Sequence, residues 1–200
     1  MQLPLPGEVA HRKAMSYSRQ RAVEARRNSS PRESAVMALM FQEKNELQLV
    51  FIVRPGGSGV HSGQVAFPGG ARDAEDNDLR ETALRELFEE TGLDSRHVEM
   101  IGELSEVYIP PSNFVVKPFV GYCHEVPQFT PSADEVDLML TEPLSNLLLP
   151  DAVQLKSTYL PKYEITMDVP SFDIQGYQLW GATAMMVMEL RDLLLAGMAK

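Results

Sequence analysis

The stretch RELFEETGL, residues 85–93, decides how this chain is interpreted because it places three glutamates close together. On a helix that advances about 100° per residue, Glu86, Glu89 and Glu90 share one face, since they are spaced i, i+3 and i+4. Like charges at that spacing cost roughly 0.2 to 0.5 kcal/mol per pair on an isolated helix. The cluster is therefore either a solvated acidic face or a device that holds a cation.

The residues around this stretch predict a helix from Leu79 to Thr91, because Gly92 is well suited to end a helix in the left-handed conformation. Leu84, Leu87 and Phe88 lie on the side opposite the glutamates. We expect this apolar side to anchor the helix on a core.

Two neighbouring features favour a cation-binding site over a solvated acidic helix face. The block FPGG, residues 67–70, precedes the helix, and its glycines allow a backbone carbonyl to turn toward the carboxylates. Hard cations such as Mg²⁺ prefer carboxylate, carbonyl and water oxygens. Arg85 can hold a neighbouring carboxylate in position through its rigid guanidinium.

The rest of the chain reads as mixed strands and helices, which predicts a layered α/β or α+β domain. Residues 34–41 and 47–53 form a β-prone pair separated by a polar turn, and residues 54–70 are glycine-rich and loop-like. Further strands are predicted at residues 98–104, 114–123, 135–141, 163–169 and 177–180, with helices at 143–149 and 182–197. The three methionines at 185, 186 and 188 are interpreted as core filler.

Length and composition favour one core and exclude several classes of protein. The chain has 200 residues, of which 44% are hydrophobic, and it contains neither a repeat of solenoid length nor a low-complexity tract. No apolar run reaches the roughly 18 residues of a membrane span, and the first residues lack the order of a signal peptide, so we expect a cytoplasmic protein that does not bind membranes. The single cysteine, Cys123, lies in an apolar run and is interpreted as a core thiol.

Charge is unevenly distributed along the chain. The net charge is −10, which argues against a nucleic-acid partner, yet residues 1–32 carry +5 and the remainder carries −15. We expect residues 1–32 to be a basic helical extension, with a helix from His11 to Arg27, and residues 33–200 to be the main domain. The extension is either a solvated helix packed across an acidic body or an arm that binds anions.

Residues 69–93, GGARDAEDNDLRETALRELFEETGL, resemble the Nudix box, the signature of the Nudix hydrolase superfamily. The residues from Arg85 to Leu93 fit its core at every position. The leading glycine, Gly70, lies fifteen residues before Arg85 rather than the usual fourteen, and this expansion is similar to the coenzyme A diphosphatase subgroup. The resemblance implies a Nudix-type α/β/α sandwich with a central mixed sheet.

The glycine-rich lead-in, residues 54–70, is similar to a second signature of that subgroup. Arg54, Gly63 and FPGG stand at its spacing, whereas Gly59 replaces a second arginine and Pro55 replaces a small residue. Two interpretations therefore remain open. The protein is either a coenzyme A diphosphatase or a Nudix hydrolase for ADP-ribose, a dinucleotide or a nucleotide sugar.

The resemblance also implies roles for individual residues. Gly69, through its carbonyl, and Glu86, Glu89 and Glu90 would bind Mg²⁺ or Mn²⁺. Glu86 is alternatively a base for the attacking water, and Arg85 would orient the set.

Three further residues of the candidate site lie outside the box. Glu135 is preferred over Glu106 as a later catalytic glutamate, although a charged residue at a strand end explains it equally well. Arg54 and His61 are candidates to bind substrate, although a lone loop histidine is more often structural.

The implied partner is a small nucleoside diphosphate, which would be hydrolysed without a serine or cysteine nucleophile. Coenzyme A would give 3',5'-ADP and 4'-phosphopantetheine. A homodimer is possible. A non-catalytic nucleotide-binding regulatory module that kept the fold is the alternative of another class.

Overall fold

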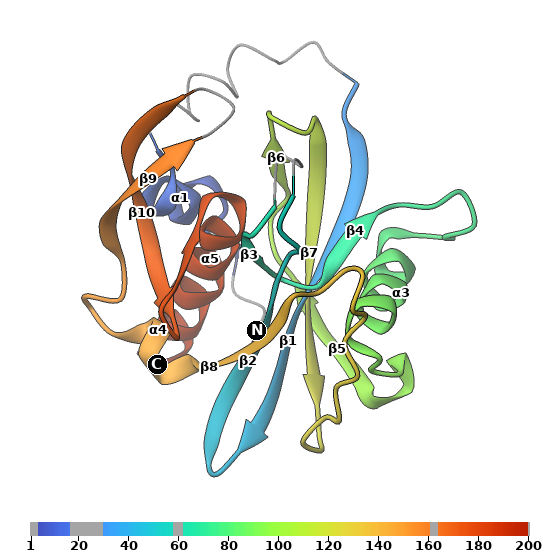
Figure 1. Cartoon of the computed structure of the whole chain (residues 1–200). Helices are drawn as coiled ribbons and strands as arrows, with labels where there is room; N and C mark the ends of the chain where they lie inside the picture. The colour runs from blue at the N-terminus through green and yellow to red at the C-terminus, as the bar shows by residue number, and fades with distance from the viewer. Residues whose placement is uncertain (1–3, 17–29, 58–61, 161–163, 200) are drawn as a thin grey trace.

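The structure is a computed structural model, and it describes residues 4–16, 30–57, 62–160 and 164–199. A central sheet lies between helix α3 on one side and helix α5 with a smaller sheet on the other (Figure 1). The predicted α/β/α sandwich with a central mixed β-sheet is thereby confirmed.

The N-terminal half of the described chain comprises α1 (Glu8–His11), η1 (Arg12–Ala14), β1 (Arg32–Glu43), β2 (Glu46–Val53), β3 (Val65–Ala66), β4 (Gly69–Ala71), α3 (Leu79–Thr91), η2 (Ser95–His97), β5 (Val98–Glu103) and β6 (Val107–Ile109).

The C-terminal half supplies the rest of both sheets. Its elements are β7 (Phe114–Cys123), β8 (Leu138–Pro143), α4 (Leu144–Leu148), β9 (Gln154–Leu160), β10 (Ile165–Ile174), β11 (Tyr177–Trp180) and α5 (Gly181–Met198). In the large sheet the order is β3-β2-β1-β7-β5, with β8 on β2, β4 on β1 and β6 on β7. The small sheet has the order β11-β10-β9.

Strand β1 organises the large sheet. Its end pairs with β2 through a two-residue turn, Lys44 and Asn45, whose positive φ angles of 51° and 65° match the turn type that twists with the strands. Along its length β1 runs parallel to β7, from the Arg32–Phe114 pair to the Phe41–Cys123 pair. A parallel pair needs a crossover, and here α3 lies on that crossover.

Side chains on the two faces of β1 pack into two separate parts of the hydrophobic core. Ala35, Met37, Leu39 and Phe41 face α3 and pack with Ala83 and Leu87. The alternating residues Ala38 and Met40 face α5, where the predicted core filler Met185, Met186 and Met188 is buried. Cys123 is also buried, at 2% exposure, as expected of a core thiol.

The predicted helix over Leu79–Thr91 is confirmed at both ends. Asp78 caps it by accepting a hydrogen bond from the Glu81 amide at 2.8 Å, and Gly92 ends it with φ of 72°. The predicted apolar side is wrong at Phe88, which is 53% exposed, whereas Leu87 is fully buried. Phe88 lies beyond the contact with the sheet because a helix on a flat surface buries only a narrow stripe.

Other differences from the predicted elements have local causes. The loop predicted over residues 54–70 contains the short strands β3 and β4, which pair with β2 and β1. The strand predicted over residues 135–141 begins only at Leu138, because residues 133–135 form a turn in which the Glu135 amide bonds Ser132. Strands β6 and β9 were not predicted, since neither segment alternates apolar and polar residues over enough positions.

The N-terminal segment packs into the body of the protein. The helix predicted over His11–Arg27 is wrong at Met15, which is extended with φ −96° and ψ 128°, and residues 17–29 lie outside the described residues. Ala10 and Ala14 are buried against α5. The division of the chain at residue 32 stays a prediction. Within the described ranges, no helix is long and apolar enough to cross a membrane.

Candidate functional site

The site forms where β1 and β2 separate and β4 lies beside β1. Gly69 opposes Val36 in that pairing and has φ of 153°. A Cβ on Gly69 would collide with the backbone of Ala35 and Val36, so only glycine fits there. The FPGG block thus brings its backbone against the central strand, directly beside α3.

Gly70 permits a second close approach, this time by a side chain. A Cβ at this position would overlap the carboxylate of Glu86. The missing side chain therefore gives the Glu86 carboxylate its place against the β4 backbone. Glu86 is half-buried, and burial raises its pKa, with Arg85 acting in the opposite direction.

Arg85 joins the carboxylates of the site into one network. Its Nη1 donates to Glu86 Oε1 at 3.0 Å and to Glu89 Oε2 at 2.8 Å. On the other side, Nε and Nη2 each donate to an oxygen of Asp76 at 3.0 Å, and Nη2 also bonds the Ala71 carbonyl. Arg85 therefore hydrogen-bonds both Glu86 and Glu89, and its role in orienting metal ligands stays a prediction.

Asp76 is the member of the network that the sequence did not identify. It is only 6% exposed, and its carboxylate also accepts hydrogen bonds from the Asp73 amide and the Thr82 hydroxyl. The bidentate contact with Arg85 holds the pKa of Asp76 well below its usual range. An acid nine residues before an arginine carries no helical or strand spacing, so no local signal points to the pair.

Glu90 is the most deeply buried carboxylate of the site, at 3% exposure. Its Oε2 accepts a hydrogen bond from the Gly69 amide at 2.7 Å, and its Oε1 lies 3.6 Å from Arg54 Nη1. Burial raises the pKa of Glu90 to about 7, against the smaller lowering effects of Arg54 and Gly69. Among the described residues, Arg54 and the Gly69 amide thus compensate the charge of Glu90 incompletely.

Arg54 lies within the site at the end of β2. Its Nη2 donates to the Gly69 carbonyl at 2.6 Å, the same carbonyl that was predicted as a metal ligand. A carbonyl has two lone pairs, so this bond leaves one of them for another partner. Arg54 is therefore next to the predicted metal ligands, within reach of any group bound to them.

Glu135 approaches the site from the segment before β8. The Ser132 amide bonds the Glu90 carbonyl at 3.1 Å and the Thr130 amide bonds Thr91 at 2.8 Å, which fixes this segment on the end of α3. Glu135 itself is exposed, and its charge contributes to raising the pKa of Glu90. The other candidate, Glu106, is exposed just before β6. His61 and Gly59 lie outside the described residues.

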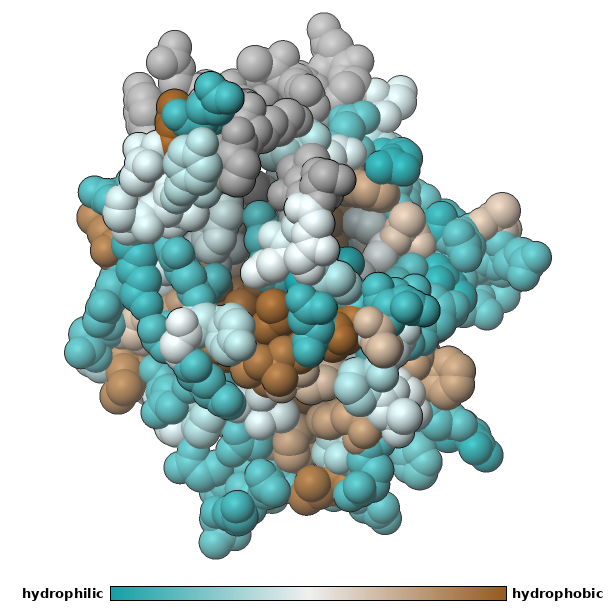
Figure 2. Space-filling view, viewed as in Figure 1, coloured by the Kyte–Doolittle hydropathy of each residue, from teal (hydrophilic) through white to brown (hydrophobic). Residues whose placement is uncertain are grey.

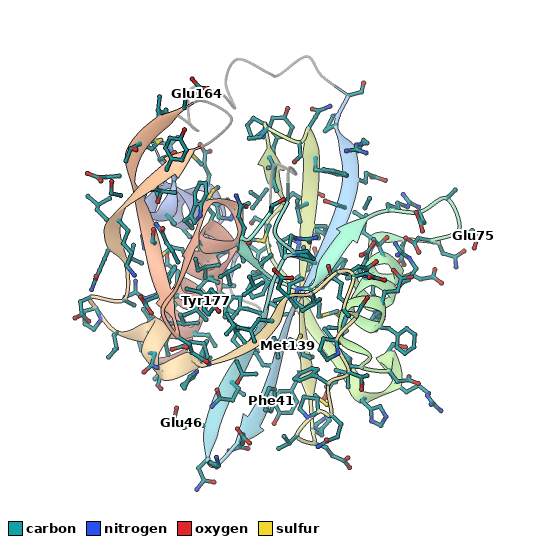
Figure 3. All side chains as sticks on the ribbon, in the orientation of Figure 1. Phe41, Glu46, Glu75, Met139, Glu164 and Tyr177 are labelled. Atoms are coloured by element: carbon teal, nitrogen blue, oxygen red, sulfur yellow. The ribbon has the colours of Figure 1, made fainter. Side chains whose placement is uncertain are left out.

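The donor set suits a hard divalent cation. Glu86, Glu89 and Glu90 offer carboxylate oxygens on one side of α3, and the Gly69 carbonyl lies beside them. Figure 3 shows side chains tipped with oxygen and nitrogen crowded between α3 and the β4 loop, whereas Glu75 points into solvent. Among the described residues no three histidine, cysteine or acidic side chains are already arranged to hold a metal ion, and Arg85 pairs with both Glu86 and Glu89. The buried, poorly compensated Glu90 is the group that a cation would satisfy.

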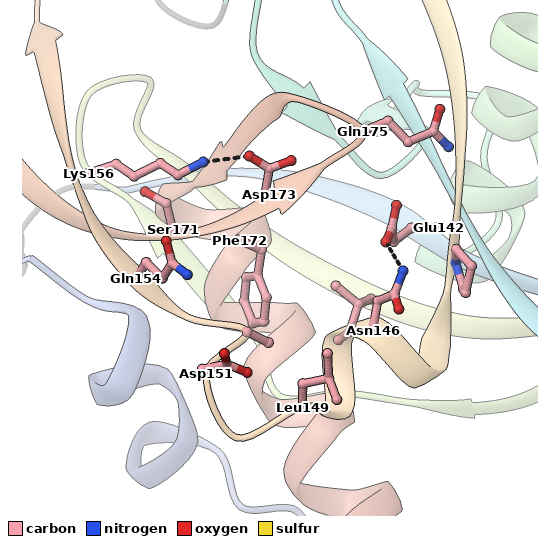
Figure 4. A pocket seen from close by; sticks show the side chains of 13 residues that line it. Glu142, Asn146, Leu149, Asp151, Gln154, Lys156, Ser171, Phe172, Asp173 and Gln175 are labelled. Atoms are coloured by element: carbon pink, nitrogen blue, oxygen red, sulfur yellow. Dashed lines mark hydrogen bonds and ion pairs between the residues drawn. The ribbon is translucent and has the colours of Figure 1, made fainter.

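A separate cavity of about 500 Å³ lies away from these carboxylates, between α4, β8 and the small sheet (Figure 4). It is lined by Glu142, Asn146, Phe172, Lys156 and Asp173, among others. Lys156 pairs with Asp173 at 2.6 Å and Asn146 bonds Glu142 at 2.8 Å. Apolar surface gathers instead at the middle of the face seen in Figure 2. The cavity contains none of the residues predicted for chemistry.

Known proteins share both the sequence and the fold of this chain. A family model described as the NUDIX domain matches residues 31–157. The chain is 35% identical over 127 residues to the peroxisomal coenzyme A diphosphatase NUDT7 of Mus musculus, covering 64% of this chain and 53% of that protein. It is 31% identical over 175 residues to the mitochondrial coenzyme A diphosphatase NUDT8 of Homo sapiens, covering 86% and 74%. An uncharacterized Nudix hydrolase NudL of Pectobacterium atrosepticum is 36% identical over 137 residues, covering 65% of this chain and 66% of that protein. The chain thus spans between half and two thirds of the length of two of these relatives.

Solved structures agree on the fold. A Nudix hydrolase from M. smegmatis, RenU, superposes with a TM-score of 0.57 at 16% identity, covering 83% of this chain and 87% of that one. A MutT protein from Methanosarcina mazei Go1 gives a TM-score of 0.53 at 18% identity, covering 82% and 95%. The family match covers well over half of the chain, and the matched region contains every described residue of the carboxylate cluster. The chain belongs to the Nudix family.

Proposed function

We propose that this protein is a metal-dependent pyrophosphohydrolase that cleaves the diphosphate of a nucleoside diphosphate linked to another group. The buried Glu90, held by the Gly69 amide yet left with a pKa raised to about 7, is the observation that carries the proposal. Burying a carboxylate without a compensating positive charge costs free energy, and a cation bound by Glu90 and Glu86 would supply that charge. Glu86, Glu89, Glu90 and the Gly69 carbonyl would hold Mg²⁺ or Mn²⁺.

The chain's own residues supply the positioning that hydrolysis needs. Water attacks one phosphorus, the bridging P–O bond breaks, and the proton of the water passes to a carboxylate, for which Glu86 and Glu135 are the candidates. A bound divalent cation supplies charge neutralisation at the phosphates. Arg85 keeps Glu86 and Glu89 in place, and Arg54 lies where it can bind a phosphate oxygen.

For the substrate, we propose coenzyme A or its derivatives, with 3',5'-ADP and 4'-phosphopantetheine as products. The support is the similarity to two relatives named coenzyme A diphosphatases. Gly59, which replaces an arginine of that signature, favours the rival substrates ADP-ribose, a dinucleotide or a nucleotide sugar. The cytoplasmic location also stays a prediction, and those two relatives are named for the peroxisome and the mitochondrion.

The test is a substrate panel with Mg²⁺ or Mn²⁺, followed by chromatography of the products. We expect hydrolysis of coenzyme A at a higher kcat/KM than of ADP-ribose, a dinucleotide or a nucleotide sugar. Turnover of ADP-ribose without turnover of coenzyme A would overturn the substrate and keep the chemistry.

A non-catalytic regulatory module is the remaining rival. It predicts that the parent protein binds nucleotides and hydrolyses none of the panel, with either metal. Nothing in the described site favours it, because a binding module has no need for the Arg85 network that positions Glu86 and Glu89.

A further inference from the structure

The small sheet ends in an edge strand that has no neighbour on one side among the described residues. Strand β9, Gln154–Leu160, pairs with β10 only, and it lies at the outer margin of the molecule (Figure 1). Such an edge presents a row of backbone donors and acceptors that another strand can pair with. The residues Leu155 and Tyr159 on it are 72% and 58% exposed.

The other long edges of the described sheets are blunted. Strand β5 carries a bulge between Met100 and Gly102 and charged residues, Glu99 and Glu103, both of which have ionic partners. The free side of β8 is covered where the Gln175 amide bonds the Thr141 carbonyl, and Pro143 ends that strand. Strand β9 has neither a bulge nor a proline, its one charged residue, Lys156, is paired with Asp173 of β10, and its register with β10 is regular over seven pairs.

The sequence of β9 is complementary to itself when two copies run antiparallel. In an antiparallel pair, two directly opposite residues point their backbone N–H and C=O groups either both toward the partner strand or both away from it. A two-fold axis that relates two copies of one strand must therefore pass midway between the two copies of a single residue. Centring it on Ser157 uses all seven residues and places Leu155 of each copy opposite Tyr159 of the other. Directly opposite side chains are in contact range, so this pairing would bury apolar surface of both Leu155 and Tyr159.

We propose that two copies of this chain associate through β9, in an antiparallel pair centred on Ser157, to join the two small sheets into one. The side chains that meet all come from the exposed face of the strand, since Leu155, Ser157 and Tyr159 are exposed and Thr158 is buried. This association is independent of the proposed hydrolysis, because no residue of the carboxylate site lies on β9.

The expected dimer is weak and depends on protein concentration. Two seven-residue edges with four apolar side chains bury less than the roughly 1,200 Å² that marks the lower bound of stable complexes. Each copy also carries a net charge of −10, so salt should strengthen the association by screening. Sedimentation of the full chain should therefore show a dimer fraction that rises with concentration and with NaCl.

Cysteine cross-linking tests the register. Ser157→Cys places two thiols directly opposite each other, within the Cα separation that a disulfide spans, and the chain's own Cys123 is buried and gives no background. We expect an oxidised dimer on denaturing gels for Ser157→Cys. The matched control Gln154→Cys, on the same strand, should stay monomeric because its counterpart is about 20 Å away, six residues along the strand.

A second pair of variants removes the association without a new thiol. Leu155→Asp and Tyr159→Asp put charges on exposed positions and should reduce the dimer fraction at least tenfold, with an unchanged circular dichroism spectrum. Equal cross-linking of Ser157→Cys and Gln154→Cys would overturn the proposal. A parent protein that sediments as a monomer at every concentration and salt would overturn it too.

Discussion

Two buried glutamates, Glu90 on α3 and Glu189 on α5, show how different surroundings give the same side chain different uses. Their exposed fractions are 3% and 0%. Glu189 accepts hydrogen bonds from Gly7 N, Ser105 N and Ser105 Oγ, and lies 2.9 Å from His11 Nε2. Burial on its own raises the pKa of Glu189, but the bonds from His11, Ser105 and Gly7 outweigh it and the pKa is lowered.

Among the described residues, Glu90 has only the Gly69 amide and a distant Arg54 to set against its burial, so its pKa rises to about 7. At Glu189 the hydrogen bonds outweigh burial, and that carboxylate ties the N-terminal segment to α5. At Glu90 the compensation is incomplete, as expected of a group that waits for a cation. The comparison distinguishes a carboxylate whose hydrogen bonds outweigh its burial from one that we propose to bind a cation, without reference to sequence motifs.

Glu90→Gln gives the largest expected change. We expect the rate of Mg²⁺-dependent diphosphate hydrolysis to fall about 10³-fold, the upper range for loss of one preorganised electrostatic group. The metal-free variant should be at least as stable as the parent at pH 8, because a neutral amide avoids the cost of burying a charge. Steady-state kinetics and urea unfolding measure the two effects. The exposed Glu75→Gln is the matched control, and a Glu90→Gln enzyme with parental rates would remove Glu90 from the mechanism.

Glu189→Ala should reverse that pattern. Removing the carboxylate leaves the buried His11 and the partly buried Ser105 and Gly7 amide without their acceptor, which should cost about 3 kcal/mol of unfolding free energy. The kcat of the folded enzyme should be unchanged. Lys13→Ala, which breaks an exposed ion pair with Asp192 in the same two segments, should cost under about 1 kcal/mol. Equal losses in urea unfolding for the two variants would contradict the distinction.

The two carboxylates should give the free energy of unfolding opposite dependences on pH. In metal-free protein the unfolded Glu90 loses its proton near pH 4.5 and the folded one near 7, so Glu90 makes unfolding easier as pH rises between those values, by about 3 kcal/mol. Glu189 stabilises the fold above pH 4.5, and this stabilisation is lost as pH falls below that value.

Urea unfolding in EDTA from pH 3 to 8 measures both effects. Glu90→Gln should flatten the profile between pH 4.5 and 7, and Glu189→Gln should flatten it below 4.5. A Glu90→Gln profile that follows the parent between pH 4.5 and 7 would mean that Glu90 titrates normally.

Mg²⁺ should change stability less than the titration or removal of either carboxylate. At a concentration 100 times its Kd a ligand of the folded state stabilises by about 2.7 kcal/mol. Protons compete for Glu90 below pH 7, so the rise in Tm on adding Mg²⁺ should be larger at pH 8 than at pH 6. Glu90→Gln should lose most of this rise, whereas Glu189→Gln should keep it. An acidic face that only solvates the helix predicts no rise at any pH.

Local signals explain how much the sequence could predict. The bounds of α3 were predictable because Gly92 marks its end and the spacing of its residues marks its length. Asp76 and Phe88 were not, since the contact of Asp76 with Arg85 and the exposure of Phe88 depend on how α3 meets β4 and the sheet. The burial of Ala10 and Ala14 likewise depends on α5, which lies at the other end of the chain.

The two adjacent glycines of β4 should behave differently under selection. A side chain at Gly69 meets the backbone of Ala35 and Val36, so a library screened for folding alone should already exclude substitutions there. A side chain at Gly70 first meets the movable carboxylate of Glu86, so its variants should pass a folding screen and fail a turnover screen. Substitutions at Gly69 would then reveal what folding requires, and substitutions at the adjacent Gly70 would reveal what catalysis requires.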